Sequence, residues 1–261
     1  MTPRRLRGGN ETGRDSVIRA LVLFVATIFA ASTTAAQLLA DGKPPVGHWL
    51  GSPEGGDTAA DATVSGSHGT ISAGKGGRSD RGPFKAAFAF EESHIDCGSG
   101  AALTELTART YSAWIMPKTW GKAKEGRIVS LGLQNSFGIK DKNRGLLFRK
   151  QFSQTNGLWS SSEASIELGK WQFVAVAYDP GSRKPPKFYV NGVESPGALI
   201  QEPAGEIAPE TLMPFTIGAD AGDTRNFDGM ISNVRVYNRV LTAIEIERLA
   251  QEPNYRLVFA E

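Results

Sequence analysis

A change of hydrophobic period marks the stretch from Phe227 to Leu249. Its first half alternates apolar and polar positions, which predicts a β-strand, because successive side chains of a strand point to opposite faces. One predicted face carries Met230, Ser232, Val234 and Val236, and the other carries Asn233, Arg235 and Tyr237. The strand is therefore expected to present one mainly apolar face to a core.

The second half of this stretch has a helical period. Its apolar residues fall near one side of a short helix: Leu241, Ile244 and Leu249. Thr242 can cap that helix, and Glu245, three residues on, completes a capping box. Pro253 lies just past the predicted end, because proline does not readily continue a helix. A strand feeding one capped helix predicts a closing element for the fold.

Short apolar runs separated by turn residues fill the chain before this unit. The predicted strands cover residues 46–50, 70–71, 86–90, 93–96, 110–117, 127–131, 137–139, 145–148, 171–178, 187–193 and 215–218. The runs at 86–90 and 93–96 are expected to pair with each other. Many short strands with only one convincing helix predict an all-β fold, a two-sheet antiparallel jelly-roll sandwich with one short C-terminal helix.

Two of these runs carry further information. Residues 171–178 are apolar on both faces, so this strand should lie in the middle of a sheet that is covered on each side. Asn191-Gly192 stands inside the run at 187–193. That pair favours a type I′ hairpin, because both central residues of such a turn need positive φ.

Composition narrows the class of protein. The 261 residues are enough for one large β domain plus a processing segment. The formal charge of +2 comes from interspersed acidic and basic residues, so nothing draws the chain electrostatically to nucleic acid. Cys97 is the only cysteine, which excludes an intrachain disulfide, and its expected role is that of a small buried hydrophobe.

The N-terminus has the pattern of an export signal. An arginine-rich leader precedes an apolar run at residues 20–31, and Thr34-Ala35-Ala36 supplies the small residues that a signal peptidase needs. We expect a signal peptide at residues 1–36, the jelly-roll domain at 37–252 and a tail at 253–261. The alternative is an uncleaved anchor, and only then would the protein be tied to a membrane. In both cases the domain is expected to be secreted, periplasmic or on the cell surface.

Six motifs in a fixed order resemble one known family. They are His48-Trp49, residues 113–117 (AWIMP), residues 169–178 (GKWQFVAVAY), residues 188–192 (FYVNG), residues 216–218 (TIG) and the closing stretch from Phe227 to Leu249. Together they resemble the laminin G-like, concanavalin A-like lectin/glucanase jelly-roll domain of exported bacterial proteins. The resemblance covers about residues 46–252 and implies two curved antiparallel sheets, one of them concave.

The resemblance does not fix one function, because members bind glycans, bind proteins or stand beside enzymes. Enzymes of the superfamily carry catalytic carboxylates on alternate residues of one strand, since both must face the sugar. No such run occurs here, and the nearest cluster, Glu91, Glu92 and Asp96, is expected to be a solvated strand edge. We therefore predict a non-catalytic module that binds a glycan or a surface protein. The alternatives are a structural or adhesion module, or a glycoside hydrolase or lyase with an unfamiliar site.

Calcium is the one cofactor that the resemblance implies. Relatives often hold it with an acidic residue of the closing strand, where this chain has Ser232. The remaining candidate ligands are Asp228, Asp61 and Asp57, because calcium takes six to eight oxygen ligands. The alternative role for these aspartates is turn chemistry, in which the carboxylate bonds its own backbone.

Tryptophans in predicted loops are the candidates for ligand contact. Trp159 and Trp120 both lie outside predicted strands, and an indole face can stack on a sugar ring. The alternative for both is that they cap the sandwich edge. Trp49, Trp114 and Trp171 lie in predicted strands and are expected in the core.

Overall fold

The computed structural model describes residues 43–51, 56–72, 74, 76–161, 165–182 and 184–258. The expected signal peptide at residues 1–36 lies outside these ranges. Within them, no helix is long and apolar enough to cross a membrane.

The elements follow one another as many short strands with few helical turns. In chain order they are β1 (Gly47–Trp49), β2 (Thr58–Ala59), β3 (Gly69–Ile71), β4 (Gly77–Ser79), β5 (Ala87–Phe90), β6 (Ile95–Asp96), α2 (Ala101–Thr104), β7 (Arg109–Pro117), η1 (Lys122–Lys124), β8 (Arg127–Leu131), β9 (Asn135–Lys140), β10 (Gly145–Lys150), β11 (Gly157–Ser161), β12 (Gln172–Tyr178), η2 (Pro180–Ser182), β13 (Lys187–Val190), β14 (Val193–Ser195), β15 (Gly197–Gln201), β16 (Phe215–Ile217), β17 (Gly229–Tyr237) and α3 (Ala243–Val258). β2, β4, β11 and β15 correspond to no predicted strand.

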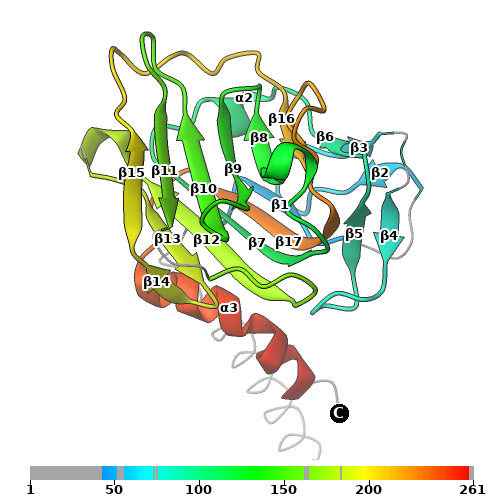
Figure 1. The fold of residues 1–261 in the computed structure, drawn as a ribbon. Helices are drawn as coiled ribbons and strands as arrows, with labels where there is room; N and C mark the ends of the chain where they lie inside the picture. The colour runs from blue at the N-terminus through cyan, green and yellow to red at the C-terminus, as the bar shows by residue number, and fades with distance from the viewer. Residues whose placement is uncertain are drawn as a thin grey trace, which may run out of the picture. The chain divides into compact units, whose positions relative to one another are not determined.

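Two antiparallel sheets form a sandwich, as predicted (Figure 1). Sheet A has the order β14-β13-β12-β7-β17-β5-β4, and β1 also pairs with β17. Sheet B has the order β15-β11-β10-β9-β8-β16-β6-β3-β2. The expected pairing of residues 86–90 with 93–96 is wrong, since β5 lies in sheet A and β6 in sheet B. Glu92 adopts a positive φ of 53° between them, and this turn redirects the chain from one sheet to the other.

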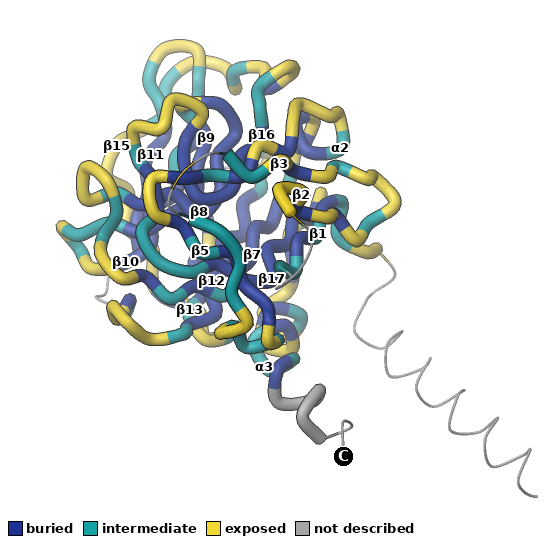
Figure 2. The backbone as a smooth tube through the Cα atoms, turned by 90° about the vertical axis from the view of Figure 1, so that its right-hand side faces the viewer, coloured by how far each residue is buried: buried dark blue, intermediate teal, exposed yellow. Residues whose placement is uncertain are grey.

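The main core lies between the two sheets, and Figure 2 shows its dark, buried strands inside a shell of exposed loops. β12 is covered on both faces, as its sequence predicts. Three of its residues face the inter-sheet core: Val174, Val176 and Tyr178. The alternate ones, Phe173, Ala175 and Ala177, pack with Ile246 and Leu249 of α3. The helix therefore provides the second cover of the sheet.

The β13–β14 hairpin turns at the predicted residues. Asn191 has φ of 50° and Gly192 has φ of 84°, which are the two positive values that a type I′ turn needs. The Asn191 side chain also accepts a hydrogen bond from the backbone N–H of Phe173 at 3.0 Å. The hairpin is thereby tied to the start of β12.

A β-bulge divides β17, and it overturns the predicted faces. The register against β7 shifts between Ser232 and Arg235, and Asn233 has a left-handed φ of 52°. One extra residue in a strand exchanges its two faces beyond the bulge. Ile231, Val234 and Val236 consequently face the inter-sheet core. Met230 and Ser232 are not on that face.

The bulge lies where the edge of β17 passes from one neighbour to another. Residues 229–231 pair with β5, and residues 234–236 pair with β1. Ser232 fills the gap: its hydroxyl lies 2.6 Å from the carbonyl oxygen of Ala86 and 3.1 Å from that of Leu50. The backbone N–H of Asn233 donates to the same Leu50 oxygen at 3.1 Å. Ser232 and Asn233 thus bond the carbonyl groups of Ala86 and Leu50, two residues that lie just outside β5 and β1.

The capping box of α3 is confirmed, but the predicted end of the helix is wrong. Thr242 N–H donates to the Glu245 carboxylate at 2.8 Å, and Glu245 N–H donates to the Thr242 hydroxyl at 3.3 Å. The helix then continues through Pro253 to Val258, so residues 253–258 of the expected tail are helical. Arg235 binds the Glu252 carboxylate through two nitrogens, at 2.9 and 2.7 Å. This pair holds the residue before the proline in the helix, against its usual extended preference.

Two details of the predicted packing also change. The apolar side of α3 carries the buried Ile246, whereas Ile244 is 62% exposed. Trp49 is fully buried, but Trp114 and Trp171 are only half buried. Trp114 packs at the margin of the helix-covered face, because it points outward from β7 rather than into the sandwich.

We expect Ser232→Ala to lower the free energy of unfolding by about 1–3 kcal/mol, the usual cost of leaving a buried acceptor without its donor. Ser232 is fully buried, and its hydroxyl is the group that reaches the Ala86 carbonyl across the bulge. Urea unfolding at neutral pH measures the difference. The matched control is Ser112→Ala in β7: its buried hydroxyl has no partner among the described residues, so its removal should change stability little. An equal loss in both variants would contradict this role for Ser232.

The closing helix should contribute to acid sensitivity. A hydrogen bond from Arg239 lowers the pKa of Glu245 below its ordinary value of 4.5. The ionised carboxylate therefore stabilises the fold fully above about pH 4.5, and this contribution is lost as the pH falls through the folded pKa. Glu245→Gln should flatten the pH dependence of stability in that acidic range. Denaturant midpoints measured from neutral to acidic pH provide the check, and an unchanged slope would refute the assignment.

Candidate functional site

A cavity of about 360 Å³ opens on the outer face of sheet A, where β5, β7 and β17 lie side by side. Its lining comes from Ala89, Phe90, Glu91, Met116, Pro117, Lys118, Gly169, Asp228, Gly229 and Met230. The volume falls within the range of small-molecule sites. We call it the Met230 cavity.

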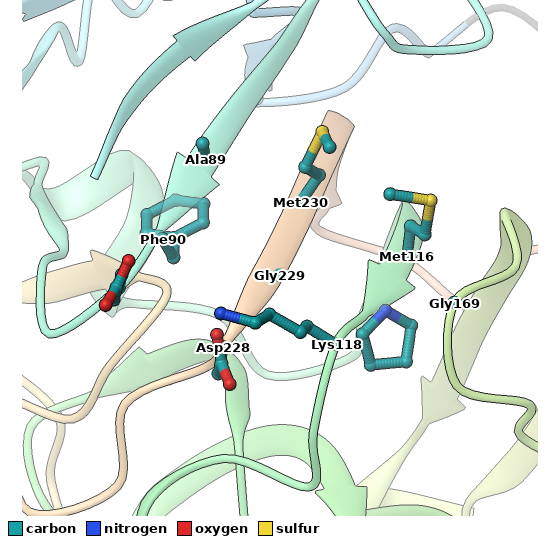
Figure 3. Close-up of a pocket in the computed structure, with 10 residues that line it drawn as sticks. Ala89, Phe90, Met116, Lys118, Gly169, Asp228, Gly229 and Met230 are labelled. Carbon is teal, nitrogen blue, oxygen red and sulfur yellow. The ribbon is translucent and has the colours of Figure 1, made fainter. Parts of the chain in front are cut away.

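The floor of the Met230 cavity is one row of paired residues across three strands. Met230 pairs with Ala89 on one side and with Met116 on the other. Because paired residues of adjacent strands share a face, the three side chains form a continuous apolar strip. Figure 3 shows the two methionine side chains on neighbouring strands, beside Ala89. Methionine is unbranched and flexible, so this floor can adapt to the shape of a ligand.

Gly229 brings the strands close together at the edge of this floor. Its φ is +141°, and a Cβ placed there would lie 2.3 Å from the Met116 carbonyl oxygen. That distance is far shorter than any normal contact, so only glycine fits without a backbone shift. The residue therefore fixes the spacing between β7 and β17 where the cavity begins.

Charged groups stand at the rim. Asp228 accepts a hydrogen bond from the Thr119 hydroxyl through Oδ2 at 2.8 Å, and its Oδ1 has no partner within the described ranges. Lys118 is exposed, and its ammonium group likewise has no partner there. Figure 3 shows the Lys118 side chain extending toward the side of the cavity on which Asp228 lies. Glu91, also exposed, adds a second carboxylate. The cavity thus combines an apolar floor with hydrogen-bonding groups of both kinds.

Trp159, predicted to contact a ligand, belongs to the core. It lies in β11, a strand that the sequence did not reveal, and it is 5% exposed. Its ring is close to those of Phe148 and Tyr178, with centroid distances of 6.1 and 5.7 Å. Ligand contact by Trp159 stays a prediction that this burial does not favour. Trp120 is half buried and packs against the inter-sheet core, and its role in binding stays a prediction.

The three aspartates proposed as calcium ligands do not come together. Asp57 is exposed beside β2. Asp61 is buried near His48, which pairs with Arg235, whereas Asp228 precedes the opposite end of β17. Within the described ranges, no three His, Cys, Asp or Glu residues lie close enough to hold a metal ion.

The Asp61 carboxylate is already occupied by protein donors. It accepts hydrogen bonds from the backbone N–H groups of His48, Thr63 and Ser67, and from the Thr63 hydroxyl, all at 2.9–3.0 Å. Such bonding to the residue two positions ahead is the turn chemistry named as the alternative. Calcium binding at these aspartates remains a prediction that the geometry does not favour.

The predicted carboxylate cluster is dispersed. Glu91, Glu92 and Asp96 are all exposed, and Asp96 accepts a hydrogen bond from the N–H of Gly98 at 2.8 Å. Only Glu91 reaches the Met230 cavity, where it joins Asp228. Sequence reasoning missed this cavity because its floor depends on the register of three strands. The one sequence signal was the presence of a methionine in each of two predicted strands, Met116 and Met230.

Comparison with known proteins agrees with this architecture. The sequence profile described as the concanavalin A-like lectin/glucanases superfamily matches residues 91–247. No curated protein matches the chain.

Solved structures resemble the chain in fold. The binding domain of Paraclostridial Mosquitocidal Protein 1 is 14% identical, with a TM-score of 0.57 over 79% of this chain and 52% of that one. Domain 4 of the GH43 extracellular arabinanase AbnA from Geobacillus stearothermophilus, in complex with arabinotriose, is 20% identical, with a TM-score of 0.55 over 79% of this chain and 98% of that one. The binding domain of botulinum neurotoxin DC, in complex with rat synaptotagmin II, is 16% identical, with a TM-score of 0.57 over 81% of this chain and 52% of that one.

The chain thus spans about half the length of the toxin binding domains and nearly all of the arabinanase domain. At these identities the likeness concerns the fold alone.

Replacing Gly229 should disturb the cavity and the fold together. Gly229→Ala places a Cβ against the Met116 carbonyl oxygen in a strained conformation, so we expect a loss of about 1–3 kcal/mol in the free energy of unfolding. The control is Gly77→Ala in β4 of the same sheet, where a Cβ would meet nothing within 4 Å. Thermal unfolding of both variants distinguishes them. A Gly229→Ala protein as stable as the control would show that the close approach is not required.

Proposed function

The chain belongs to the concanavalin A-like lectin/glucanase superfamily, and from this premise we propose that it is a non-catalytic module that binds carbohydrate in the Met230 cavity. The observation that carries the proposal is the combination of an apolar floor with two polar groups at the rim, the Lys118 ammonium group and Asp228 Oδ1, that have no partner within the described ranges. A sugar ring has the same division, with an apolar C–H face and hydroxyls around its edge. Lys118 supplies donors to those hydroxyls, and Asp228 supplies an acceptor.

The proposed location of this activity is outside the cytoplasm. The support is the export-signal pattern at residues 1–36, with its basic leader, apolar run and small residues. Glycans of the envelope and its surroundings are then the accessible ligands. The neutral balance of charge also fits a ligand other than nucleic acid.

Catalysis in the Met230 cavity is less favoured than carbohydrate binding. Glu91 and Asp228 both line it, and a glycosidase needs two carboxylates about the scissile bond. However, Glu91 is exposed to solvent, whereas a general acid is usually kept in an enclosed setting that raises its pKa. Reducing-sugar release from a polysaccharide panel tests this reading. Release that is lost in both Glu91→Gln and Asp228→Asn would replace the binding module with an enzyme.

A protein partner is the second candidate, and β15 is the observation that favours it. This strand ends sheet B, and all five of its residues are exposed. Leu199 and Ile200 are each 50% exposed. An exposed apolar edge strand can pair with an extended segment of another protein. Stoichiometric co-purification of an envelope protein, lost in Ile200→Lys, would favour this candidate over carbohydrate binding.

A glycan array followed by calorimetry tests the proposal directly. For the best glycan found, Lys118→Ala should weaken binding by about tenfold, because a charge-assisted hydrogen bond contributes 1.5–3 kcal/mol. Lys184→Ala is the matched control, since Lys184 is exposed and does not line the cavity, and it should bind like the wild type. Absence of any glycan ligand, or equal weakening in both variants, would contradict the assignment to this cavity.

A further inference from the structure

A second cavity, of about 310 Å³, opens at a different place, where β7 begins and β10 ends. Arg109 starts β7 of sheet A, and Lys150 ends β10 of sheet B, so the cavity lies over the junction between the sheets. The loop with Glu210 completes its floor. The rest of its lining comes from residues 104–107, Pro180, Ile207 and Ala208, of which Ile207 is exposed. We call it the Lys150 cavity.

The floor of the Lys150 cavity holds two cations and one carboxylate, all buried. Arg109 is 2% exposed, Lys150 1% and Glu210 7%. Glu210 Oε1 accepts from Arg109 Nη1 at 3.0 Å and from Lys150 Nζ at 2.6 Å, while Oε2 accepts from Arg109 Nη2 at 2.7 Å. Three interactions thus converge on a single carboxylate. Among these three buried groups the positive charge exceeds the negative charge by one, and the exposed carboxylate of Glu105 also lines the cavity.

Hydrogen-bond donors also remain unused. Arg109 donates to Tyr111 and Leu106 besides Glu210, but its buried Nε has no partner among the residues that the structure describes. Lys150 has three N–H groups and two acceptors, Glu210 and the Asn135 side chain. Buried donors are normally bonded, so two unmatched N–H groups in one cavity call for a ligand or water. Burial also lowers the pKa of Lys150, although the hydrogen-bonded Glu210 carboxylate acts in the opposite direction.

We propose that the Lys150 cavity binds a small hydroxylated carboxylate, such as a sugar acid. A single carboxylate balances the excess positive charge of the three buried groups and accepts from the two unmatched donors. Among the lining residues, Thr107 can offer a hydroxyl group to the rest of the ligand, and the exposed Ile207 can offer apolar contact. A doubly charged phosphate would carry an extra negative charge toward Glu210 and Glu105. The site is separate from the Met230 cavity, so either assignment can fail without the other.

The test uses the purified full chain and two probes of matched shape, sodium glucuronate and neutral glucose, at constant ionic strength. Glucuronate should raise the unfolding temperature in a saturable manner, and glucose should not. Lys150→Met should weaken glucuronate binding by about tenfold or more in calorimetry, the effect of one charge-assisted hydrogen bond. The fold should survive, because this change leaves Arg109 and Glu210 as a balanced pair.

A second variant leaves the buried cluster intact. Ile207 is 43% exposed at the mouth, so Ile207→Glu places a negative charge across the path of an anion and should weaken glucuronate binding. Ile244→Glu on α3, also at an exposed isoleucine and away from the cavity, is the control and should bind like the wild type. Equal shifts with glucuronate and glucose would overturn the proposal. Tighter binding of inorganic phosphate than of glucuronate would overturn the assignment to a carboxylate.

Discussion

The hydrogen bonding of β17 on both of its edges is the constraint on which sheet A depends. β7 occupies one edge along almost the whole strand, and β5 and β1 share the other. Two neighbours can share one edge only if the backbone between them finds other partners. Ser232 and Asn233 supply these partners through the bulge. The same bulge decides which side chains of β17 enter the core and leaves Met230 on the outer face, so the core and the candidate site have one structural origin.

Much of the fold follows from local sequence, because the signals act over a few residues. The two apolar faces of β12, the Asn191-Gly192 turn and the Thr242–Glu245 capping box each depend on near neighbours, and each was predicted correctly. The faces of β17 were not, because period-two reasoning assumes an unbroken pleat. Asn233 alone breaks it, by adopting a left-handed conformation that asparagine tolerates but does not require. Trp159 was wrongly predicted to lie in a loop for a related reason. The sequence of β11 has no alternation of apolar and polar residues that could distinguish a buried strand from a loop.

The candidate sites were less predictable than the fold, because they are built from residues distant in sequence. Ala89, Met116 and Met230 meet only through strand register, and Arg109, Lys150 and Glu210 meet only at the junction of two sheets. No spacing rule links such positions. From residue type alone, tryptophans and aspartates were predicted as site residues. In the structure, methionines form the floor of one cavity, and a buried lysine lines the other.

The cluster around Arg235 has a consequence for how the fold can be used. The Arg235 side chain donates from Nε to Nε2 of His48 at 3.4 Å, near the start of the described sandwich, and its other nitrogens bind Glu252 in α3. The points where the polypeptide enters and leaves the sandwich are therefore held together by one side chain. A fold with adjacent entry and exit can be spliced into a surface loop of a host protein with little distortion of the host. The geometry of this sandwich would therefore allow it to be inserted as a unit into other proteins.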